Sequence, residues 1–356
     1  MKTAVVFDTL TERGGGERAT LVLARAFDAD VYTTTYDSQG VYPEYQNFNV
    51  FSDPLLSLKL RCQGSVTRSV QGGLFQTECL YKFRKTDLSG YDLVITLGQA
   101  KHIPVYPGAK RVHYELWVKN SYRFGNLVKP WVLYMDKVER EAIGRIKTLA
   151  CNSENIRRQM LDFYHRDAEV IYPAVNINMF HTGKTEDYFL AVERLATEKN
   201  IEAQLEAFRM APQQKLLIAG APNNSHMPYL KKLRRMAPPN VTFLGRVSDS
   251  ELIDLYSHAR ATIQTNLNED LGRIPIEAMA SGKPCIAFNA GGFRETIVHG
   301  QTGILIDPPY VENLADAIRH FNNADFKQEN CLARAQLFSE EAHIARMKSL
   351  VARISA

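Results

Sequence analysis

The sequence lacks long apolar runs and paired cysteines, and each absence excludes a class of protein. No stretch approaches the roughly 18 apolar residues that predict a membrane-spanning helix. The cysteines are odd in number, lie far apart and form no C-x-x-C pair; they are Cys62, Cys79, Cys151, Cys285 and Cys331. A disulfide framework or a zinc site is therefore not expected, and a reducing compartment fits best.

The start of the chain also lacks the features of a secretion signal. MKTAVVFD reads as a first strand, without the longer apolar core and small-residue cleavage site of a signal peptide. The net charge of +4 is too small to indicate a nucleic-acid partner by itself. We therefore expect a cytoplasmic protein that does not bind nucleic acid.

Length and patterning indicate an α/β protein with two domains. The 356 residues exceed what one hydrophobic core usually serves. Short apolar runs rich in β-branched residues alternate with amphipathic helical segments, which is typical of doubly wound parallel sheets. The predicted strands are 3–8, 29–35, 92–98, 110–115, 148–153, 188–194, 215–220, 240–245, 261–265 and 284–288.

The strand–helix alternation restarts after residues 169–187, a segment with a proline, two asparagines and a polar end. We therefore predict a first domain at 1–170, a linker at 171–187 and a second domain at 188–337. The end of the chain, 338–356, reads as one amphipathic helix that packs back on the protein. Two similar domains favour a ligand site where they face each other.

The glycines near the start match a cofactor-binding pattern only in part. Gly14-x-Gly16-x-x-Ala19 satisfies the dinucleotide consensus, but TLTER separates it from the first strand, which makes the loop too long for that fold. Three interpretations stay open here. The glycines form an NAD loop, an ordinary helix start, or a place where a ligand approaches the backbone.

The second half carries a more specific arrangement of charges. Glu269 falls in a loop after a predicted strand, and Glu277 falls in the helix that follows, so both can face the carboxyl ends of the strands. Arg194 follows another strand, and Lys199 lies just before the next helix. Cations suit a diphosphate and carboxylates suit sugar hydroxyls, so the set indicates a nucleotide-sugar site. The alternative is a solvated Arg–Lys pair and a helix-start glutamate favoured by the helix dipole.

Segments along nearly the whole chain resemble glycosyltransferase family 4, which has two Rossmann-like domains in the GT-B fold. They are GGGER, ACNSENIRRQM, VIYPAVNINMF, ERLATEKNIEAQLEAF, LLIAGAP, VTFLGRVSDSELIDLYSHARATI and NEDLGRIPIEAMASGKPCIAFNAGGFRETI. About 36–90 and 114–147 lie outside the resemblance. The E-x7-E stretch with EAMASGKP is its most specific part.

The resemblance implies a retaining glycosyltransferase that needs no metal or other cofactor. It implies that Arg194 and Lys199 offset the charge of the diphosphate leaving group, and that Glu269 lies beside the donor sugar. Glu277 is implied to bind the ribose, and the amides of Leu271 and Gly272 to lie near sugar or phosphate.

In the first domain, the resemblance places Gly15 and Gly16 against the diphosphate and matches His113 to a histidine of the site. For His113, a packed core histidine is the alternative. Arg273 stands where the family has an apolar residue, which implies either a further cation near phosphate or a solvent-facing side chain. The Val192-Glu193 pair stands where the family often has a glycine.

The implied substrates are a nucleotide-sugar donor and a glycan or lipid-linked acceptor. The EDLGRIPIEAMASGKP segment is most similar to mannosyltransferases that use GDP-mannose, and UDP-sugars stay open. Residues 59–85 mix basic and apolar side chains, which suits either peripheral contact with an anionic membrane or a solvated helix pair. A sugar-nucleotide epimerase, a non-catalytic nucleotide-sugar binding protein and an NAD dehydrogenase are the other hypotheses.

Overall fold

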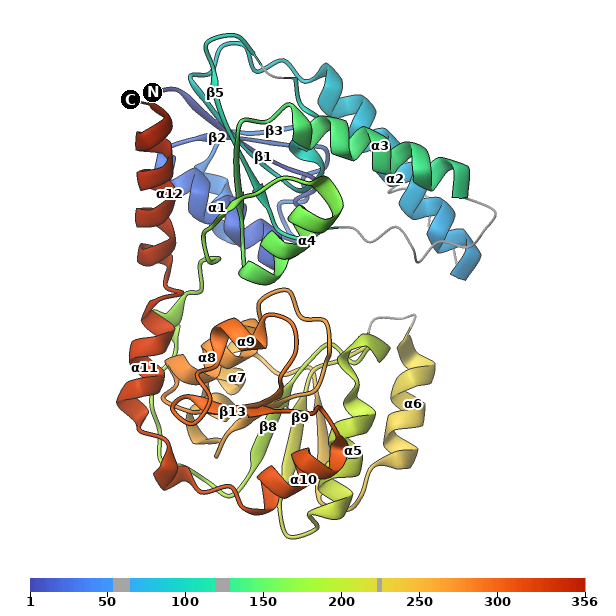
Figure 1. Cartoon of the computed structure of the whole chain (residues 1–356), viewed down its shortest axis with the longest axis vertical. Helices are drawn as coiled ribbons and strands as arrows, with labels where there is room; N and C mark the ends of the chain where they lie inside the picture. Colours follow the sequence, from blue (N-terminus) through green and yellow to red (C-terminus); the bar gives the residue numbers. More distant parts are fainter. Residues whose placement is uncertain (54–64, 105, 119–128, 223–225, 356) are drawn as a thin grey trace. The chain divides into compact units, whose positions relative to one another are not determined.

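The computed structural model describes residues 1–53, 65–104, 106–118, 129–222 and 226–355 (Figure 1). It divides into two compact units, Met1–Ala174 with His343–Ala356, and Val175–Ala342. Each unit has one parallel sheet with helices on both faces, so the predicted α/β class with two Rossmann-like sheets is confirmed. The last helix, which we predicted at 338–356, spans Glu340–Ser355, and most of it lies in the first unit.

The first unit has a seven-stranded sheet in the order β3-β2-β1-β4-β5-β6-β7. Its strands are β1 (Thr3–Phe7), β2 (Asp30–Thr33), β3 (Val50–Ser52), β4 (Leu93–Leu97), β5 (Lys110–Glu115), β6 (Thr148–Cys151) and β7 (Glu169–Val170). Its helices are α1 (Gly15–Phe27), α2 (Ser65–Lys85), α3 (Lys129–Gly144), α4 (Glu154–Tyr164) and α12 (Glu340–Ser355), with short 3-10 turns η1 (Pro43–Asn47) and η3 (Gly98–His102).

Alternation along β1 divides the core of this unit into two faces, because successive side chains of a strand point to opposite sides. Val5 and Phe7 pack in a cluster with α1 and with Met347 of α12. Ala4 and Val6 pack with Cys79 of α2 and with other residues of the opposite face. Both faces of β1 are therefore buried, which explains its continuous apolar sequence.

The second unit has a six-stranded sheet in the order β10-β9-β8-β11-β12-β13. Its strands are β8 (Phe189–Val192), β9 (Leu216–Ala219), β10 (Val241–Gly245), β11 (Thr262–Gln264), β12 (Cys285–Phe288) and β13 (Gly303–Ile306). Its helices are α5 (Ile201–Met210), α6 (Met227–Met236), α7 (Asp249–His258), α8 (Arg273–Ala280), α9 (Phe293–Thr296), α10 (Val311–Arg319) and α11 (Gln328–Gln336), with turns η6 (Ile177–Met179), η7 (Thr197–Lys199) and η9 (Asn323–Asp325).

All ten predicted strands are present, each within two residues of its predicted ends. Three short strands were not predicted: β3, β7 and β13. All three lie at sheet edges, and β3 and β7 have only three and two residues, too few for a pattern to emerge. Cys79, Cys151, Cys285 and Cys331 are free and buried, and Cys62 lies outside the described residues.

Candidate active site

In the second unit, the predicted site residues gather where the strand order reverses. The sheet runs outward in one direction from β8 and in the other from β11, so the loops after these two strands diverge, as at the ligand-binding edge of open α/β sheets. Arg194 and Lys199 follow β8, and Glu269 follows β11. The order of the strands thus accounts for charges 70 residues apart in sequence meeting at one edge.

Lys199 and Glu269 form an ion pair at this edge. The Lys199 Nζ lies 2.9 Å from the Glu269 Oε2, and the two side chains are 24% and 21% exposed. Burial opposes the charge on Lys199, but the Glu269 carboxylate outweighs it, so the pKa of Lys199 is raised. Asn266 donates a second hydrogen bond to the Glu269 Oε2. The pair is charged, ordered and still accessible to a ligand.

Arg194 lies beside this pair but has a different partner. Its guanidinium contacts the Glu198 carboxylate at 2.6 Å, and the Arg194 side chain is 57% exposed. An ion pair this open contributes little to stability. The guanidinium can therefore turn toward an anionic ligand at small cost.

Two glycines hold the backbone of the Glu269 loop from behind. The Gly292 amide donates to the Glu269 carbonyl at 2.8 Å. A Cβ on Gly291 would lie 2.5 Å from that carbonyl oxygen, and one on Gly292 would lie 2.3 Å from the Leu271 Cα. Gly291 also has a positive φ of 51°. Only glycine allows this close approach. Gly291 and Gly292 therefore fix the backbone position of Glu269.

Gly272 begins helix α8 and turns the loop into it. It has a φ of 90°, a conformation that favours glycine, and a Cβ there would contact the Phe293 ring. Leu271 is buried beside it. Pro275 lies in the first turn of α8, where its missing amide hydrogen costs nothing.

Glu277 lies within α8 and is held by two side chains. The Tyr256 hydroxyl donates to the Glu277 Oε2 at 2.7 Å, and the Arg273 guanidinium lies 3.4 Å from Oε1. Burial and the neighbouring carboxylate raise the pKa of Tyr256 well above its usual value, so it stays a hydrogen-bond donor. One prediction for Arg273 was a side chain that simply faces solvent. The Arg273 side chain is only 40% exposed, and its guanidinium is paired with Glu277.

Glu193, noted in the sequence only as a departure, is a buried carboxyl directly before Arg194. It accepts a hydrogen bond from the Gln204 amide, and the Gln264 amide is 3.5 Å away. Burial raises the pKa of Glu193 to about 8. At neutral pH this carboxyl is mostly protonated, so it adds little negative charge beneath the Lys199–Glu269 pair.

In the first unit, Gly15 and Gly16 form the first turn of α1, on the carboxyl side of β1. A Cβ on Gly16 would lie 2.3 Å from the Phe7 ring, so glycine lets the helix start pack directly on the strand. The Gly14 backbone is extended and caps the helix without a side chain. The close packing gives Gly16 a structural reason of its own.

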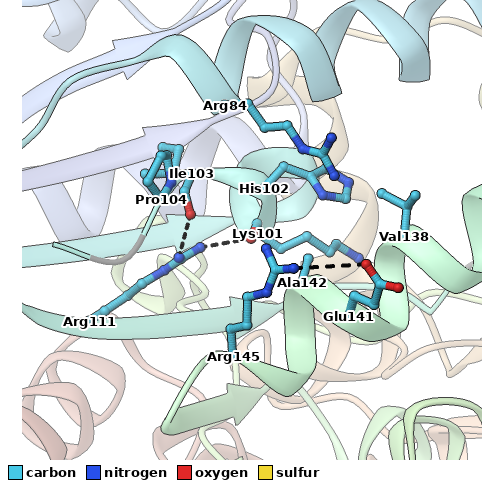
Figure 2. A pocket seen from close by; sticks show the side chains of 10 residues that line it. All are labelled: Arg84, Lys101, His102, Ile103, Pro104, Arg111, Val138, Glu141, Ala142 and Arg145. Carbon is cyan, nitrogen blue, oxygen red and sulfur yellow. Dashed lines mark hydrogen bonds and ion pairs between the residues drawn. The ribbon is translucent and has the colours of Figure 1, made fainter.

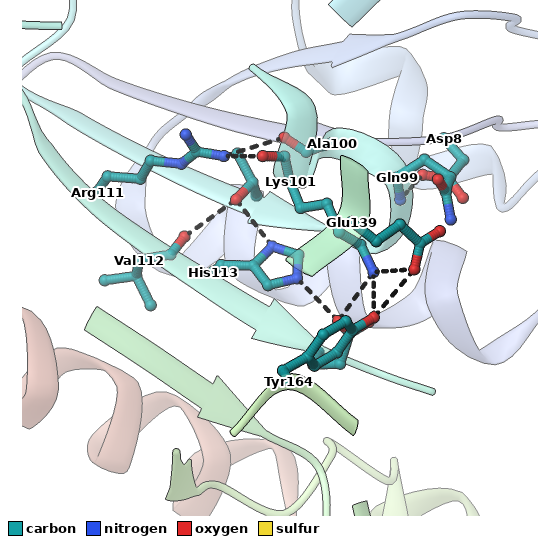
Figure 3. Close-up of polar contacts among 11 residues, drawn as sticks. Asp8, Gln99, Ala100, Lys101, Arg111, Val112, His113, Glu139 and Tyr164 are labelled. Atoms are coloured by element: carbon teal, nitrogen blue, oxygen red, sulfur yellow. Dashed lines mark hydrogen bonds and ion pairs between the residues drawn. The ribbon is translucent and has the colours of Figure 1, made fainter. Parts of the chain in front are cut away.

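His113 is fully buried in the first unit. It lies on β5 (Figure 3). Its Nδ1 is 3.0 Å from the Thr96 hydroxyl and its Nε2 is 3.3 Å from the Glu115 carboxylate. Burial is the main reason that the pKa of His113 is lowered. This environment favours the alternative of a packed core histidine over contact with a substrate.

Sequence reasoning missed Glu198, Tyr256 and Asn266, which contact the predicted charges. Glu198 and Asn266 lie four and three residues from their partners, so local spacing alone contained the signal. Tyr256 contacts Glu277 only because α7 packs on α8, which no local pattern reveals. In residues 59–85, positions 59–64 and the side chains of 65–74 lie outside the described residues, so membrane contact there stays a prediction.

Two features are absent from the described residues. None of the helices there has the length and apolar character that crossing a bilayer demands. In those same segments, no three His, Cys, Asp or Glu side chains gather as ligands of a metal ion would.

Comparisons with known proteins indicate the activity class and the fold. Residues 177–337 match the family model of the glycosyl transferases group 1. The alpha-1,3/1,6-mannosyltransferase ALG2 of Mus musculus is 27% identical over 361 residues, which cover 86% of this chain and 84% of that protein. The O-antigen chain mannosyltransferase RfbU of Salmonella typhimurium is 31% identical over 54% of this chain and 58% of its own.

Solved structures show the same fold over the full length. The sucrose-phosphate synthase of Thermosynechococcus elongatus aligns with a TM-score of 0.76 at 19% identity, covering 99% of each chain. Alr3699/HepE of Anabaena, solved in complex with UDP, aligns with a TM-score of 0.74 at 19% identity, covering 99% of this chain and 100% of its own. The second half of the chain thus matches the group 1 glycosyltransferases, and this chain is a glycosyltransferase with two Rossmann-like domains of the GT-B type.

Proposed function

We propose that this chain is a retaining, metal-independent mannosyltransferase of family 4, which moves mannose from GDP-mannose to a glycan or lipid-linked acceptor. The observation that carries the proposal is the partly exposed Lys199–Glu269 pair at the point where the sheet order reverses, with Arg194 beside it. A cation and a carboxylate in contact at that point suit a donor that has both a diphosphate and a sugar.

The cations answer the main electrostatic demand of the reaction. Breaking the bond between the anomeric carbon and the phosphate oxygen leaves negative charge on the departing diphosphate. Lys199 and Arg194 stabilise that charge where it develops, which is the role that metal ions have in other transferases. Both cations now contact carboxylates, so the diphosphate would compete with Glu269 and Glu198 for them.

The remaining predicted residues bind the donor. Glu269 accepts hydrogen bonds from the sugar hydroxyls, and Glu277 accepts them from the ribose. The amides of Leu271 and Gly272 and the Arg273 guanidinium approach phosphate or sugar, and Gly15 and Gly16 approach the diphosphate from the first domain. Tyr256 supports this assignment, because its bond to Oε2 holds the Glu277 carboxylate in one orientation.

Retention of the anomeric configuration is explained by attack of the acceptor on the same face of the sugar from which the diphosphate departs. The acceptor oxygen bonds to the anomeric carbon as the bond to the phosphate oxygen breaks, and the acceptor proton passes to the departing phosphate. Glu269 is a positioning group in this scheme and forms no covalent bond. Its contacts with Lys199 and Asn266 support that role, since they engage the same Oε2 atom.

We propose mannose rather than another hexose as the transferred sugar because two relatives, ALG2 and RfbU, are named mannosyltransferases. The UDP complex of the Anabaena protein supports the rival, a UDP-sugar donor. A thermal-shift panel of GDP, UDP, GDP-mannose and UDP-glucose, with EDTA and with Mg²⁺, separates the two. A ligand that binds only the folded state raises the melting temperature by mass action.

We expect stabilisation by GDP and GDP-mannose that persists in EDTA and weakens in Glu277→Ala. Radiolabelled GDP-mannose with an acceptor mixture should then yield labelled glycan of retained configuration. Stabilisation by UDP alone would mean that the donor is a UDP-sugar and not GDP-mannose. Stabilisation that depends on Mg²⁺ would contradict the metal-independent scheme. Release of free sugar without an acceptor product would favour an epimerase instead.

A further inference from the structure

The first unit has a second polar cavity, away from the residues discussed so far (Figure 2). It measures about 710 Å³ and lies among the end of α2, the segment after η3 and the second half of α3. Three arginines, Arg84, Arg111 and Arg145, line it beside one acidic residue, Glu141. Lys101 and His102 also line it, but the Lys101 ammonium is paired with Glu115 and Glu139. A cavity of this size and charge is suited to a small anion.

Arg111 is the least usual member of this set. It is 9% exposed, and its guanidinium donates to the carbonyls of Ile103, Ala100 and Lys101. Its Nε has no hydrogen-bond partner, and no carboxylate of the described residues lies within ion-pair distance. Buried charges are usually paired with an opposite charge, so a buried arginine without an acidic partner beside a cavity favours the binding of an anion.

Burial lowers the pKa of Arg111 to about 10, so the guanidinium still carries its charge at neutral pH. Three backbone carbonyls hold the side chain in place, which fixes the position of that charge. The charge is therefore preorganised and cannot turn away to solvent.

The other two arginines are exposed and adaptable. Arg145 contacts Glu141 only at 3.9 Å, with side chains 70% and 46% exposed, a pair too open to neutralise it. Arg84 extends from the end of α2 toward the same space (Figure 2). Guanidinium groups bind phosphate oxygens in bidentate fashion, so these two can close on a ligand beside Arg111.

A neighbouring pocket of about 490 Å³ extends the basic surface. It shares Arg111 and Arg145 with the first cavity and adds Lys110 and Lys147, and no acidic side chain lines it. Its other walls include Tyr106, Pro107 and Ile354, which offer apolar contact. A ligand with a phosphate group and a less polar remainder would fill both spaces.

The arginines of this surface lie toward the opposite end of the sheet from the residues proposed to hold the donor, whereas Lys101, which also lines the cavity, lies at the carboxyl end. Arg111 is the second residue of β5 and Lys147 directly precedes β6, so both lie at the amino ends of strands. Gly15 and Gly16 follow the carboxyl end of β1 in the same parallel sheet. The cavity therefore serves a purpose other than holding the donor diphosphate.

We propose that Arg84, Arg111 and Arg145 form a second anion site, which binds a phosphomonoester or diphosphate group away from the transfer site. The phosphate belongs either to a soluble phosphorylated metabolite or to a lipid headgroup, since both present the same oxygens. Arg111 supplies the fixed charge, and Arg84 and Arg145 supply the hydrogen bonds that close on the ligand.

The test measures binding of inorganic phosphate and pyrophosphate by calorimetry, with chloride controls at equal ionic strength. It uses Lys199→Met as the background, so that binding at the donor site does not contribute. Arg84→Ala/Arg145→Ala removes the adaptable arginines and leaves the three Arg111 hydrogen bonds intact. Arg158→Ala, which removes one exposed arginine of α4 in the same unit, is the control for loss of surface charge.

We expect saturable binding in the background and in Arg158→Ala, and at least tenfold weaker binding in the double variant. Flotation with vesicles containing phosphatidic acid distinguishes the lipid source, because inorganic phosphate would then compete with the vesicles for the same arginines. Equal phosphate binding by the double variant and the control would overturn the proposal. So would the absence of saturable binding to both the soluble anions and the vesicles.

Discussion

Each unit has a lysine–glutamate contact at the carboxyl end of its sheet, but the two contacts differ in burial. In the first unit, Lys101 lies 3.0 Å from Glu115, with side chains 2% and 0% exposed. In the second, Lys199 lies 2.9 Å from Glu269, and about a fifth to a quarter of each side chain is exposed. The same chemistry therefore serves two purposes.

The number of protein partners explains the difference. The Lys101 ammonium contacts Glu115, Glu139 and the Tyr164 hydroxyl, which matches its three N–H donors (Figure 3). Among the described residues, the Lys199 ammonium donates only to Glu269, which leaves donors for a ligand. A saturated ion cluster holds the fold together, whereas an unsaturated one at a sheet edge is available for binding.

The largest effect is expected from Lys101→Met. It leaves two carboxylates buried without their cation, which costs about 3–5 kcal/mol of unfolding free energy. At a loss of roughly 2–4 °C for each kcal/mol, the melting temperature should fall by on the order of 10 °C. Calorimetry measures it, with the exposed Lys137→Met of α3 as the matched control. Equal melting of the two variants would break the comparison, because the cluster would then not hold the fold.

Lys199→Met should show the reverse pattern. Removing a cation that stabilises the leaving group lowers kcat/KM by roughly 100- to 1000-fold, or about 3–4 kcal/mol. The melting temperature should change little, because the lost pair is partly solvated. Steady-state kinetics with the donor identified by the thermal-shift panel checks this. Lys215→Met, which changes an exposed lysine at the amino end of β9, should retain activity. If Lys199→Met lowered the melting temperature but kept its kcat/KM, Lys199 would have the structural role that we assign to Lys101.

Tyr256→Phe tests whether Glu277 is held in place for a ligand. The change removes one hydrogen bond to a carboxylate, worth about 1.5 kcal/mol, and should raise the KM for the donor about tenfold with little change in kcat. Tyr188→Phe is the matched control, because that hydroxyl donates to the Leu255 carbonyl in the same region. If both variants raise the KM for the donor equally, the effect comes from packing, and the hydrogen bond from Tyr256 to Glu277 does not contribute to donor binding.

Much of this could be predicted from the sequence, since buried parallel strands are apolar throughout and short motifs mark the loops after them. The pairing of Lys199 with Glu269 follows once the strand order is known, but no local pattern gives that order. The position of His113 was less accessible to prediction, because a histidine near the end of a strand looks the same whether it faces solvent or the core. Tyr256 and Arg111 depend on helix packing and on carbonyls of a neighbouring turn, which only the folded chain brings together.

The comparison extends to two buried glutamates with opposite environments. Burial disfavours the charge on both, but Lys101 and His113 hold the pKa of Glu115 below its usual value. Glu193 contacts only amides, and burial raises its pKa to about 8. A buried carboxylate thus keeps its charge only where a cation is in contact with it.

Glu193→Gln measures this smallest effect. An acid whose pKa is raised in the folded state stabilises most when protonated, and that stability falls as the pH rises toward the folded pKa. The unfolded carboxyl is already ionised at pH 7, so the remaining loss between pH 7 and pH 9 is about 1 kcal/mol. The variant should lack this loss, so its melting temperature relative to wild type should rise by roughly 2–4 °C over that interval. The exposed Glu186→Gln should follow wild type throughout. Parallel curves for Glu193→Gln and wild type would mean that Glu193 is ionised in the folded protein, and that a buried carboxylate here keeps its charge without a contacting cation.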